Sequence, residues 1–238
     1  MRFFERSEED DEYYKLLESY DDFVNDQIST RYDFPIRMRY WELVQVLRAV
    51  DLSFRLERVM DTGSVNTFLG FWLSRICDEV IVSDLLPERV YKNILRRIGV
   101  LKRKKTEANI ETWFRTIKSN PSIRVRSVDL TRIQYPDCHF DLITSISVIE
   151  HVPDVEKAIS EMYRCLKVGG KLLLTTDCSP TGKPLADGAR YFSHDELKTM
   201  FSGYPVSSEF REPDFKEENW CYRRDQPLLM TFLEITKD

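Results

Sequence analysis

The sequence predicts an α/β fold built on a doubly wound, mostly parallel sheet with helices on both faces. From residue 56 onward, short runs rich in β-branched residues alternate with stretches of helical periodicity. Such alternation is typical of parallel strands joined by crossover helices. In addition, 238 residues with 42% hydrophobic residues suit one large domain with a sizeable core better than two small ones.

Residues 1–50 are predicted to form a helical extension ahead of the main domain, which would span residues 51–238. Apolar residues recur at helical spacing within 13–23, and again within 41–47 after the break at Phe34-Pro35. Stripes of this kind usually pack against a core. The alternative is a helical lid over the functional site.

The main domain is predicted to alternate strands and helices along the chain. The expected elements are a strand at 58–61, a helix at 67–76, a strand at 79–83, a helix at 87–98, a helix around Trp113, strands at 123–128 and 140–147, a helix at 154–166 and a strand at 171–176. Two late strands, at 201–212 and 228–236, suit an antiparallel pair at the edge of the sheet. A capping box at Ser193 and Glu196 predicts a further helix that begins at His194.

Composition excludes several classes of function. A net charge of −5 argues against a general affinity for nucleic acid, which requires a basic surface. No stretch approaches the roughly 18–20 apolar residues of a membrane span, and the acidic start lacks the apolar core of a signal peptide. The five cysteines are odd in number and scattered, so we expect a reducing cytoplasm, without disulfides or structural zinc.

Polar residues follow the first two predicted strands of the sheet. In a doubly wound sheet, ligands bind at the carboxyl ends of the strands. Asp61-Thr62-Gly63-Ser64 joins a strand to a helix, where backbone N–H groups favour an anionic group and glycine permits a close approach. Asp84, followed by Leu85, ends the second strand about 20 residues later. A carboxylate there can accept hydrogen bonds from both hydroxyls of a ribose.

The next two strand ends carry similar signals. Asp129 and Leu130 follow the third strand, where a carboxylate can accept the amino proton of adenine while a leucine packs on the ring. Ser145 and Ser147 close the fourth strand and lead into Glu150-His151-Val152. The sequence therefore predicts a nucleoside-binding pocket along this edge of the sheet.

From about Leu56 to Asp177 the chain resembles the class I S-adenosylmethionine-dependent methyltransferases of the type 11 domain, whose fold is Rossmann-like. The most specific segments are 140–152, with its Glu-His-Val turn, and 166–176, with its two adjacent glycines. The resemblance implies that S-adenosylmethionine is the cofactor. The residues that it assigns to cofactor binding are Asp61, Thr62, Gly63, Ser64, Asp84, Leu85, Asp129, Leu130, Ser145 and Ser147.

The cofactor loop departs from the family pattern. Val65 and Thr67 stand where D-x-G-x-G-x-G has its second and third glycines, and the side chain of Val65 could crowd the methionine moiety. One hypothesis is a methyltransferase acting on a small-molecule or glycan-type hydroxyl. The alternative is a catalytically silent methyltransferase-like domain that serves as a binding or regulatory partner.

His151 is the candidate general base, because a neutral imidazole can take a proton from the acceptor as the methyl group transfers. Its structural alternative is to cap the following helix or to bond to a backbone carbonyl. The acceptor is expected between residues 147–151, the loop 178–188 and the amino-terminal helices. Aromatic and basic residues nearby suit a sugar bearing phosphate: Tyr191, Phe192, Trp220, Lys183, Arg190 and Arg223. No metal is expected, and the sequence leaves the oligomeric state open.

Overall fold

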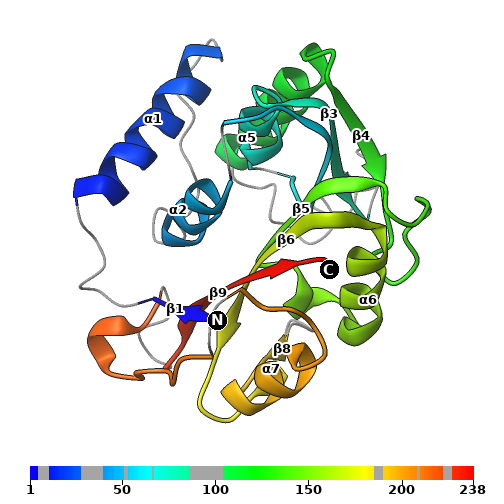
Figure 1. The fold of residues 1–238 in the computed structure, drawn as a ribbon. Helices are drawn as coiled ribbons and strands as arrows, with labels where there is room; N and C mark the ends of the chain where they lie inside the picture. Colours follow the sequence, from blue (N-terminus) through cyan, green and yellow to red (C-terminus); the bar gives the residue numbers. More distant parts are fainter. Residues whose placement is uncertain are drawn as a thin grey trace.

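The computed structural model describes residues 1–4, 11–27, 40–50, 53–65, 67–85, 104–184, 190–207, 210–221 and 227–238. A central seven-stranded sheet has helices on both faces (Figure 1). Its strands are β1 (Arg2–Phe3), β2 (Leu56–Thr62), β3 (Cys77–Asp84), β4 (Ile123–Ser127), β5 (Phe140–Ile146), β6 (Leu166–Cys178) and β9 (Leu229–Thr236). β7 (Lys183–Pro184) and β8 (Arg190–Tyr191) form a separate two-stranded ribbon. The helices are α1 (Asp11–Gln27), α2 (Tyr40–Ala49), α3 (Leu69–Leu73), α5 (Lys104–Ser119), α6 (Val155–Cys165) and α7 (His194–Phe201), with 3-10 turns at Ile149–His151 and Glu217–Asn219.

The strand order is β1-β9-β6-β5-β2-β3-β4. β4, β3, β2, β5 and β6 pair in parallel, and β9 runs antiparallel to both β6 and β1. The chain winds outward from β2 to β4 and then returns to the other side of β2 as β5. The switch point of a doubly wound sheet, where ligands bind, therefore lies between β2 and β5. These pairings confirm the predicted fold, including its antiparallel strand.

The sheet separates two apolar cores, because successive strand side chains point to opposite faces. In β6, Leu173 faces the core beside α1, α2, α3 and α5, while Leu172 and Leu174 face the core beside α6 and α7. The largest fully buried side chains include Trp41 and Trp113 in the first core and Phe140 and Phe201 in the second. Burial on both faces explains why the central strands are almost continuously hydrophobic in sequence.

Side-chain caps fix where the helices beside the second core begin. Asp154 is the N-cap of α6 and accepts a hydrogen bond from the Lys157 amide at 3.0 Å. Ser193 and Glu196 form the predicted capping box of α7, with reciprocal bonds of 3.2 and 2.8 Å. Such a cap contributes about 1 kcal/mol to helix stability.

Three of the predicted elements differ from the structure. The described residues of the segment 201–212 form no strand: Phe201 ends α7, and the backbone of the segment pairs with β9 at an isolated bridge from Val206 to Ile235. The outer edge of β9 is instead occupied by β1, which lies within the segment predicted as helical. The helix expected at 67–76 is shorter in the structure: α3 has its N-cap at Phe68 and its C-cap at Ser74.

The helix predicted at 87–98 lies outside the described residues. Among the residues that the structure describes, no helix is both long enough and apolar enough to cross a membrane.

Candidate active site

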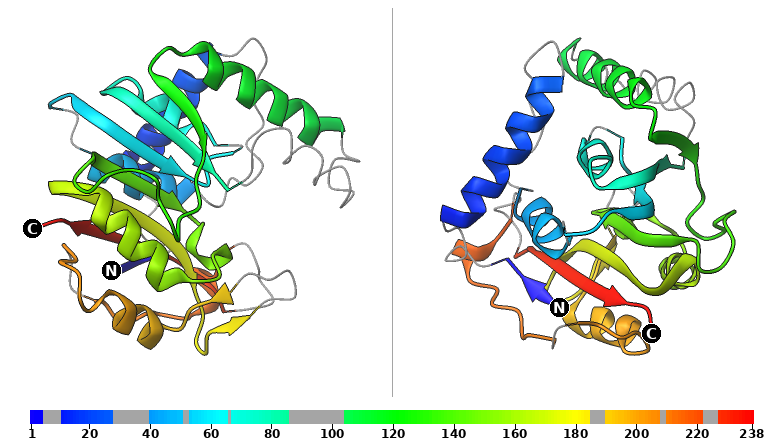
Figure 2. Two further views of the ribbon diagram at one scale, coloured as in Figure 1. Left: turned by 90° about the vertical axis from the view of Figure 1, so that its right-hand side faces the viewer. Right: turned by 45° about the horizontal axis from the view of Figure 1, so that its top comes forward.

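The carboxyl ends of four parallel strands, β2, β3, β4 and β5, meet along one edge of the sheet. The carboxyl end of the antiparallel strand β9 lies at the opposite edge (Figure 2, left). The strand registers align the last residues of β2 with Ser83 and Ser145, and Asp84 with Ser127. The structure therefore brings together the four predicted turns, which lie after β2, β3, β4 and β5.

The turn after β2 depends on a glycine in the left-handed region. Gly63 has φ +59°, and a Cβ added there would lie 2.4 Å from Cγ2 of Val148, in the turn after β5. Ser64 joins this turn to β3, because its amide donates to the carbonyl of Ser83 at 3.1 Å. Val65, in place of the family's second glycine, is half-buried and packs against the first core.

Asp61 and Thr62 brace the turn from inside the protein. The Asp61 carboxylate is buried and accepts hydrogen bonds from the Thr144 hydroxyl at 2.7 Å and the Gly70 amide at 3.1 Å. Burial raises the pKa of Asp61 from 3.8 to about 7, against the opposing effect of both hydrogen bonds. The Thr62 hydroxyl donates to the Thr144 carbonyl at 3.1 Å. These side chains fix β2 to β5 and to α3, beneath the surface that a ligand would meet.

A cavity of about 230 Å³ opens at the ends of β3 and β4 beneath α5. Its walls combine polar groups from the strand ends with apolar and basic groups from α5 and the β2 turn: Ser64, Val65, Val82, Ser83, Asp84, Trp113, Phe114, Lys118, Val125, Arg126 and Ser127. Asp84 is partly exposed there, and the neighbouring Leu85 is 60% exposed, one of three large hydrophobic side chains described as exposed. A few polar groups beside apolar walls are typical of small-molecule sites.

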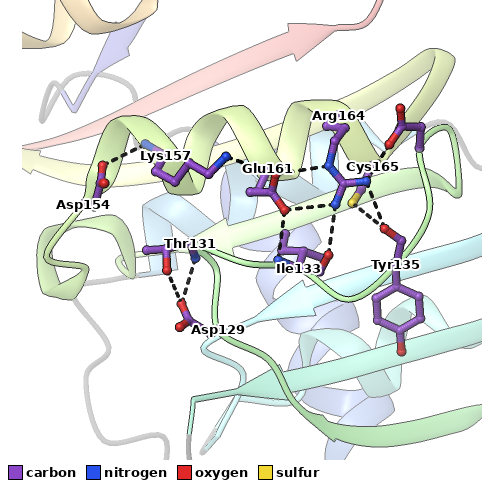
Figure 3. Close-up of polar contacts among 10 residues, drawn as sticks. Asp129, Thr131, Ile133, Tyr135, Asp154, Lys157, Glu161, Arg164 and Cys165 are labelled. Carbon is purple, nitrogen blue, oxygen red and sulfur yellow. Dashed lines mark hydrogen bonds and ion pairs between the residues drawn. The ribbon is translucent and has the colours of Figure 1, made fainter.

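Asp129 lies at the surface after β4 (Figure 3). Its Oδ1 accepts hydrogen bonds from the side chain of Thr131 at 2.7 Å and from the Thr131 amide at 2.9 Å. These bonds lower the pKa of the Asp129 carboxyl, the side-chain bond most. Leu130 points the other way and is buried in the second core. The carboxylate, rather than the leucine, faces the surface.

The segment after Asp129 is held against α6 by Arg164 (Figure 3). The Arg164 guanidinium donates to the carbonyls of Ile133 at 2.9 Å and Tyr135 at 3.0 Å, and it pairs with Glu161 at 3.0 Å. Glu161 in turn accepts from the Ile133 amide at 3.1 Å. This network ties the backbone at Ile133 and Tyr135 to α6.

The end of β5 places Ser145 and Ser147 very differently. Ser145 is fully buried, and among the described residues its hydroxyl has no hydrogen-bond partner. Ser147 has φ +51°, and its hydroxyl donates to Oε1 of Glu42 in α2 at 2.7 Å. Its amide donates to the carbonyl and the hydroxyl of Thr175, each at 3.1 Å.

His151 ends the 3-10 turn that follows, and its side chain is exposed. Within the described part of the chain, its imidazole makes no hydrogen bond and no ring contact. The capping role considered for His151 is wrong, because Asp154 caps α6. The described residues contain no group of three or more His, Cys, Asp or Glu side chains that could hold a metal ion.

Two residues of the amino-terminal helices reach this edge, although the sequence did not identify them. Glu42 of α2 is fully buried beside Ser147, and the hydroxyl of Tyr20 in α1 accepts from the Phe68 amide, just before α3, at 3.2 Å. The available signal was a carboxylate at position 42 inside an otherwise apolar helical stripe. Its partner lies 105 residues away, so the contact itself has no local signature.

Most of the aromatic side chains predicted to stack on a sugar are buried. Tyr191 and Phe192 are 3% and 0% exposed, in the first and second cores respectively, so their prediction as open stacking surfaces is wrong. Arg190 forms an ion pair with Glu196. Trp220 is partly buried, and its indole N–H donates to a backbone carbonyl. The side chain of Lys183, residues 185–188 and Arg223 lie outside what the structure describes.

Comparisons with known proteins agree with this geometry. A methyltransferase domain family matches residues 71–174. The ubiquinone/menaquinone biosynthesis C-methyltransferase of Psychromonas ingrahamii is 40% identical over 68 residues, which is 29% of this chain and 27% of that protein. A ubiquinone biosynthesis O-methyltransferase of Xanthomonas oryzae is 32% identical over 162 residues, 67% of this chain and 57% of that protein. The chain thus spans between about a quarter and three fifths of the length of these two curated relatives.

A solved structure shares the fold at lower sequence identity. The N-methyltransferase NodS from Bradyrhizobium japonicum, in complex with S-adenosyl-L-homocysteine, superposes with a TM-score of 0.53 and 17% identity, covering 96% of this chain and 99% of that one. The matched domain contains β3, β4 and β5, three of the four strands whose ends form the edge described above. The chain thus contains a methyltransferase domain, and it has the fold of the class I S-adenosylmethionine-dependent methyltransferases.

Proposed function

We propose that this protein binds S-adenosylmethionine at the carboxyl edge of its sheet and methylates a small molecule. The supporting observation is that Gly63, Asp84 and Asp129 follow three neighbouring strands at the same edge of the sheet, where Asp84 lines the cavity beneath α5. Gly63 lets the backbone approach the methionine moiety, Asp84 accepts the ribose hydroxyls, and Asp129 accepts the adenine amino proton. The exposed side chain of Leu85 lies beside Asp84, where it would cover the adenine ring.

The acceptor in this proposal is a small molecule that carries a hydroxyl group. When bound, S-adenosylmethionine supplies an electrophilic methyl group on its sulfonium. His151 would take the hydroxyl proton, because its exposed imidazole follows β5 and has no partner among the described residues. Orientation of the acceptor by the surrounding turns would supply much of the remaining rate enhancement. The curated relatives named above act in ubiquinone and menaquinone biosynthesis, which also favours a small acceptor.

A glycan acceptor has less support than a small hydroxyl compound. The rings that motivated it, Tyr191 and Phe192, are buried. We therefore restrict the proposal to a hydroxyl-bearing small molecule and leave sugar stacking out of it.

For helices α1 and α2 we propose a fixed wall rather than a mobile lid. α1 and α2 contribute Tyr20 and Trp41 to the first core, at 1% and 0% exposure, together with main-domain residues. A lid that opens would have to remove these aromatic side chains from the core. Each such removal costs several kcal/mol, by analogy with truncation of buried aromatics to alanine at about 3–5 kcal/mol.

A catalytically silent binding domain is the second candidate. It is favoured by Val65 and Thr67, which replace two glycines of the family's cofactor loop. The two candidates differ in turnover: a silent domain would produce no methylated product with any acceptor.

The test is calorimetric titration with S-adenosylmethionine and S-adenosylhomocysteine, followed by methyl-transfer assays with a panel of phenols, catechols and aliphatic alcohols. Asp84→Ala should weaken binding. Asp78→Ala is the matched control, because Asp78 lies at the opposite end of β3 in an exposed ion pair with Arg55. Absence of heat and of any thermal shift at millimolar ligand would refute cofactor binding. Binding without product across the panel would favour the silent domain.

A further inference from the structure

Ser147 adopts a backbone conformation that a serine does not hold by itself. Its φ of +51° lies in the left-handed region, where a Cβ is disfavoured and where non-glycine residues need support from their surroundings. Thr175 and Glu42 provide such support. Thr175 accepts from the Ser147 amide through both its carbonyl and its hydroxyl, and Glu42 accepts from the Ser147 hydroxyl at 2.7 Å.

The conformation at Ser147 sets the geometry of the whole turn. The next residue, Val148, lies so close to Gly63 that a methyl group on the glycine would come within 2.4 Å of it. The 3-10 turn that ends at His151 begins immediately afterwards, at Ile149. A change at position 147 would therefore alter both the spacing between the β2 and β5 turns and the position of the proposed base.

Glu42 is well placed to hold the turn and poorly placed to touch a ligand. It is fully buried, so its carboxylate acts through Ser147 rather than on a bound molecule. The helix that carries it is fixed at both ends. Trp41 packs edge-to-face on Phe4 with ring centroids 5.9 Å apart, and the Lys171 ammonium donates to the Ala49 carbonyl at 3.4 Å.

We propose that Glu42 is a positioning residue of the methyl-transfer site: its carboxylate holds Ser147 in the left-handed conformation and so sets the β5 turn against Gly63. This inference rests on the proposed function for its effect on cofactor affinity. The effect on the turn itself does not depend on any ligand. Helix α2 would thus shape a site whose predicted cofactor-binding residues all come from the main domain.

Glycine adopts left-handed backbone readily, and this provides a direct test. Glu42→Ala is made in the natural chain and in the Ser147→Gly background, and the dissociation constant for S-adenosylhomocysteine is measured by calorimetry in all four proteins. If Glu42 acts by holding Ser147, its removal should weaken binding about tenfold in the natural background and less than twofold in the glycine background. An equal loss in both backgrounds would overturn the proposal.

Hydrogen exchange by mass spectrometry supplies a readout that needs no ligand. Glu42→Ala should accelerate amide exchange in residues 145–152, and the Ser147→Gly background should restore slow exchange. If the unmodified protein binds no S-adenosylhomocysteine, the proposed function fails and this measurement alone decides whether Glu42 holds the turn. Unchanged exchange in Glu42→Ala would refute it.

Two further variants separate positioning from general destabilisation. Glu42→Leu fills the same space without a hydrogen-bond acceptor. If Glu42→Ala does not fold, Glu42→Leu takes its place in the comparison of the four proteins. Glu42→Gln keeps an acceptor oxygen and should lose less affinity than either. Gln45→Ala is the matched control: it removes a buried polar side chain, 2% exposed, from the same helix and should lower the melting temperature without accelerating exchange in 145–152. Faster exchange there in the control would contradict a specific role for Glu42.

Discussion

Gly63→Ala should be far more damaging than Gly169→Ala, although both glycines have positive φ. Gly63 has φ +59° and faces Val148, whose nearest methyl carbon would lie 2.4 Å from an added Cβ. Gly169 has φ +76° and no atom within 4 Å of the same position. Both variants carry the strain of a left-handed alanine, but only Gly63→Ala adds a steric clash.

The magnitudes follow from these two contributions. Left-handed strain costs about 1–2 kcal/mol, and forcing an extra methyl group into a packed contact costs about 1–3 kcal/mol more. Gly169→Ala should therefore lose about 1–2 kcal/mol of unfolding free energy, and Gly63→Ala about 2–5 kcal/mol. For a protein of this size each kcal/mol corresponds to roughly 2–4 °C in melting temperature.

The assay is thermal unfolding of both variants, together with the double variant Gly63→Ala, Val148→Ala. Removing the valine methyl groups should relieve the clash but not the strain, so the second substitution should cost less in the Gly63→Ala protein than in the natural one. Equal losses for Gly63→Ala and Gly169→Ala, or strict additivity in the double variant, would refute the close contact between the two turns.

Three further predictions concern single side chains. The pKa of Asp61 in the folded protein, about 7, lies above its ordinary value of 3.8. The protonated side chain therefore contributes its full stabilisation below about pH 4. As the pH rises through 7, the free energy of unfolding should fall by up to about 4 kcal/mol. Asp61→Asn should flatten this dependence in melts from pH 5 to 8, and an unchanged slope would argue against a raised pKa. Asp84→Ala should weaken cofactor binding by roughly 1–3 kcal/mol, because a charged acceptor is lost; an unchanged dissociation constant would place the ribose elsewhere. His151→Ala should lower kcat by about 10²–10⁴ with little change in cofactor affinity. A collapse of affinity instead would make His151 a structural residue of the pocket.

The central sheet was predictable because its strands are buried on both faces and stand out as apolar runs between polar turns. The segment 201–212 was wrongly predicted to be a strand for a related reason. Tyr204, Val206 and Phe210 are all partly buried against the second core, so the segment has the composition of a strand. Apolar spacing reports which side chains are buried, and it does not report whether the backbone pairs with a neighbour. β1, with two residues, is too short to show any period.

The strand-end turns of the site were predictable because the carboxyl ends of parallel strands always share an edge. The sequence was a poorer guide to which side chains face outward, since Leu130 is buried while Leu85 is exposed. The contact between Glu42 and Ser147 could not be predicted from the sequence, because it depends on how α2 packs across β5, β6 and β9. Whether the assigned residues bind the cofactor stays a prediction.

The position of β9 also has a consequence for folding. β9 pairs Phe232 with Arg2 on one side and Thr175 on the other. Contacts between residues so far apart in the chain close large loops and form slowly. During synthesis the outer edge of β6 stays unpaired until residues 229–236 have emerged, and β1 has no strand to join until then. We expect this open edge to be the point at which nascent chains associate wrongly, so that slower elongation before residue 229 would raise aggregation.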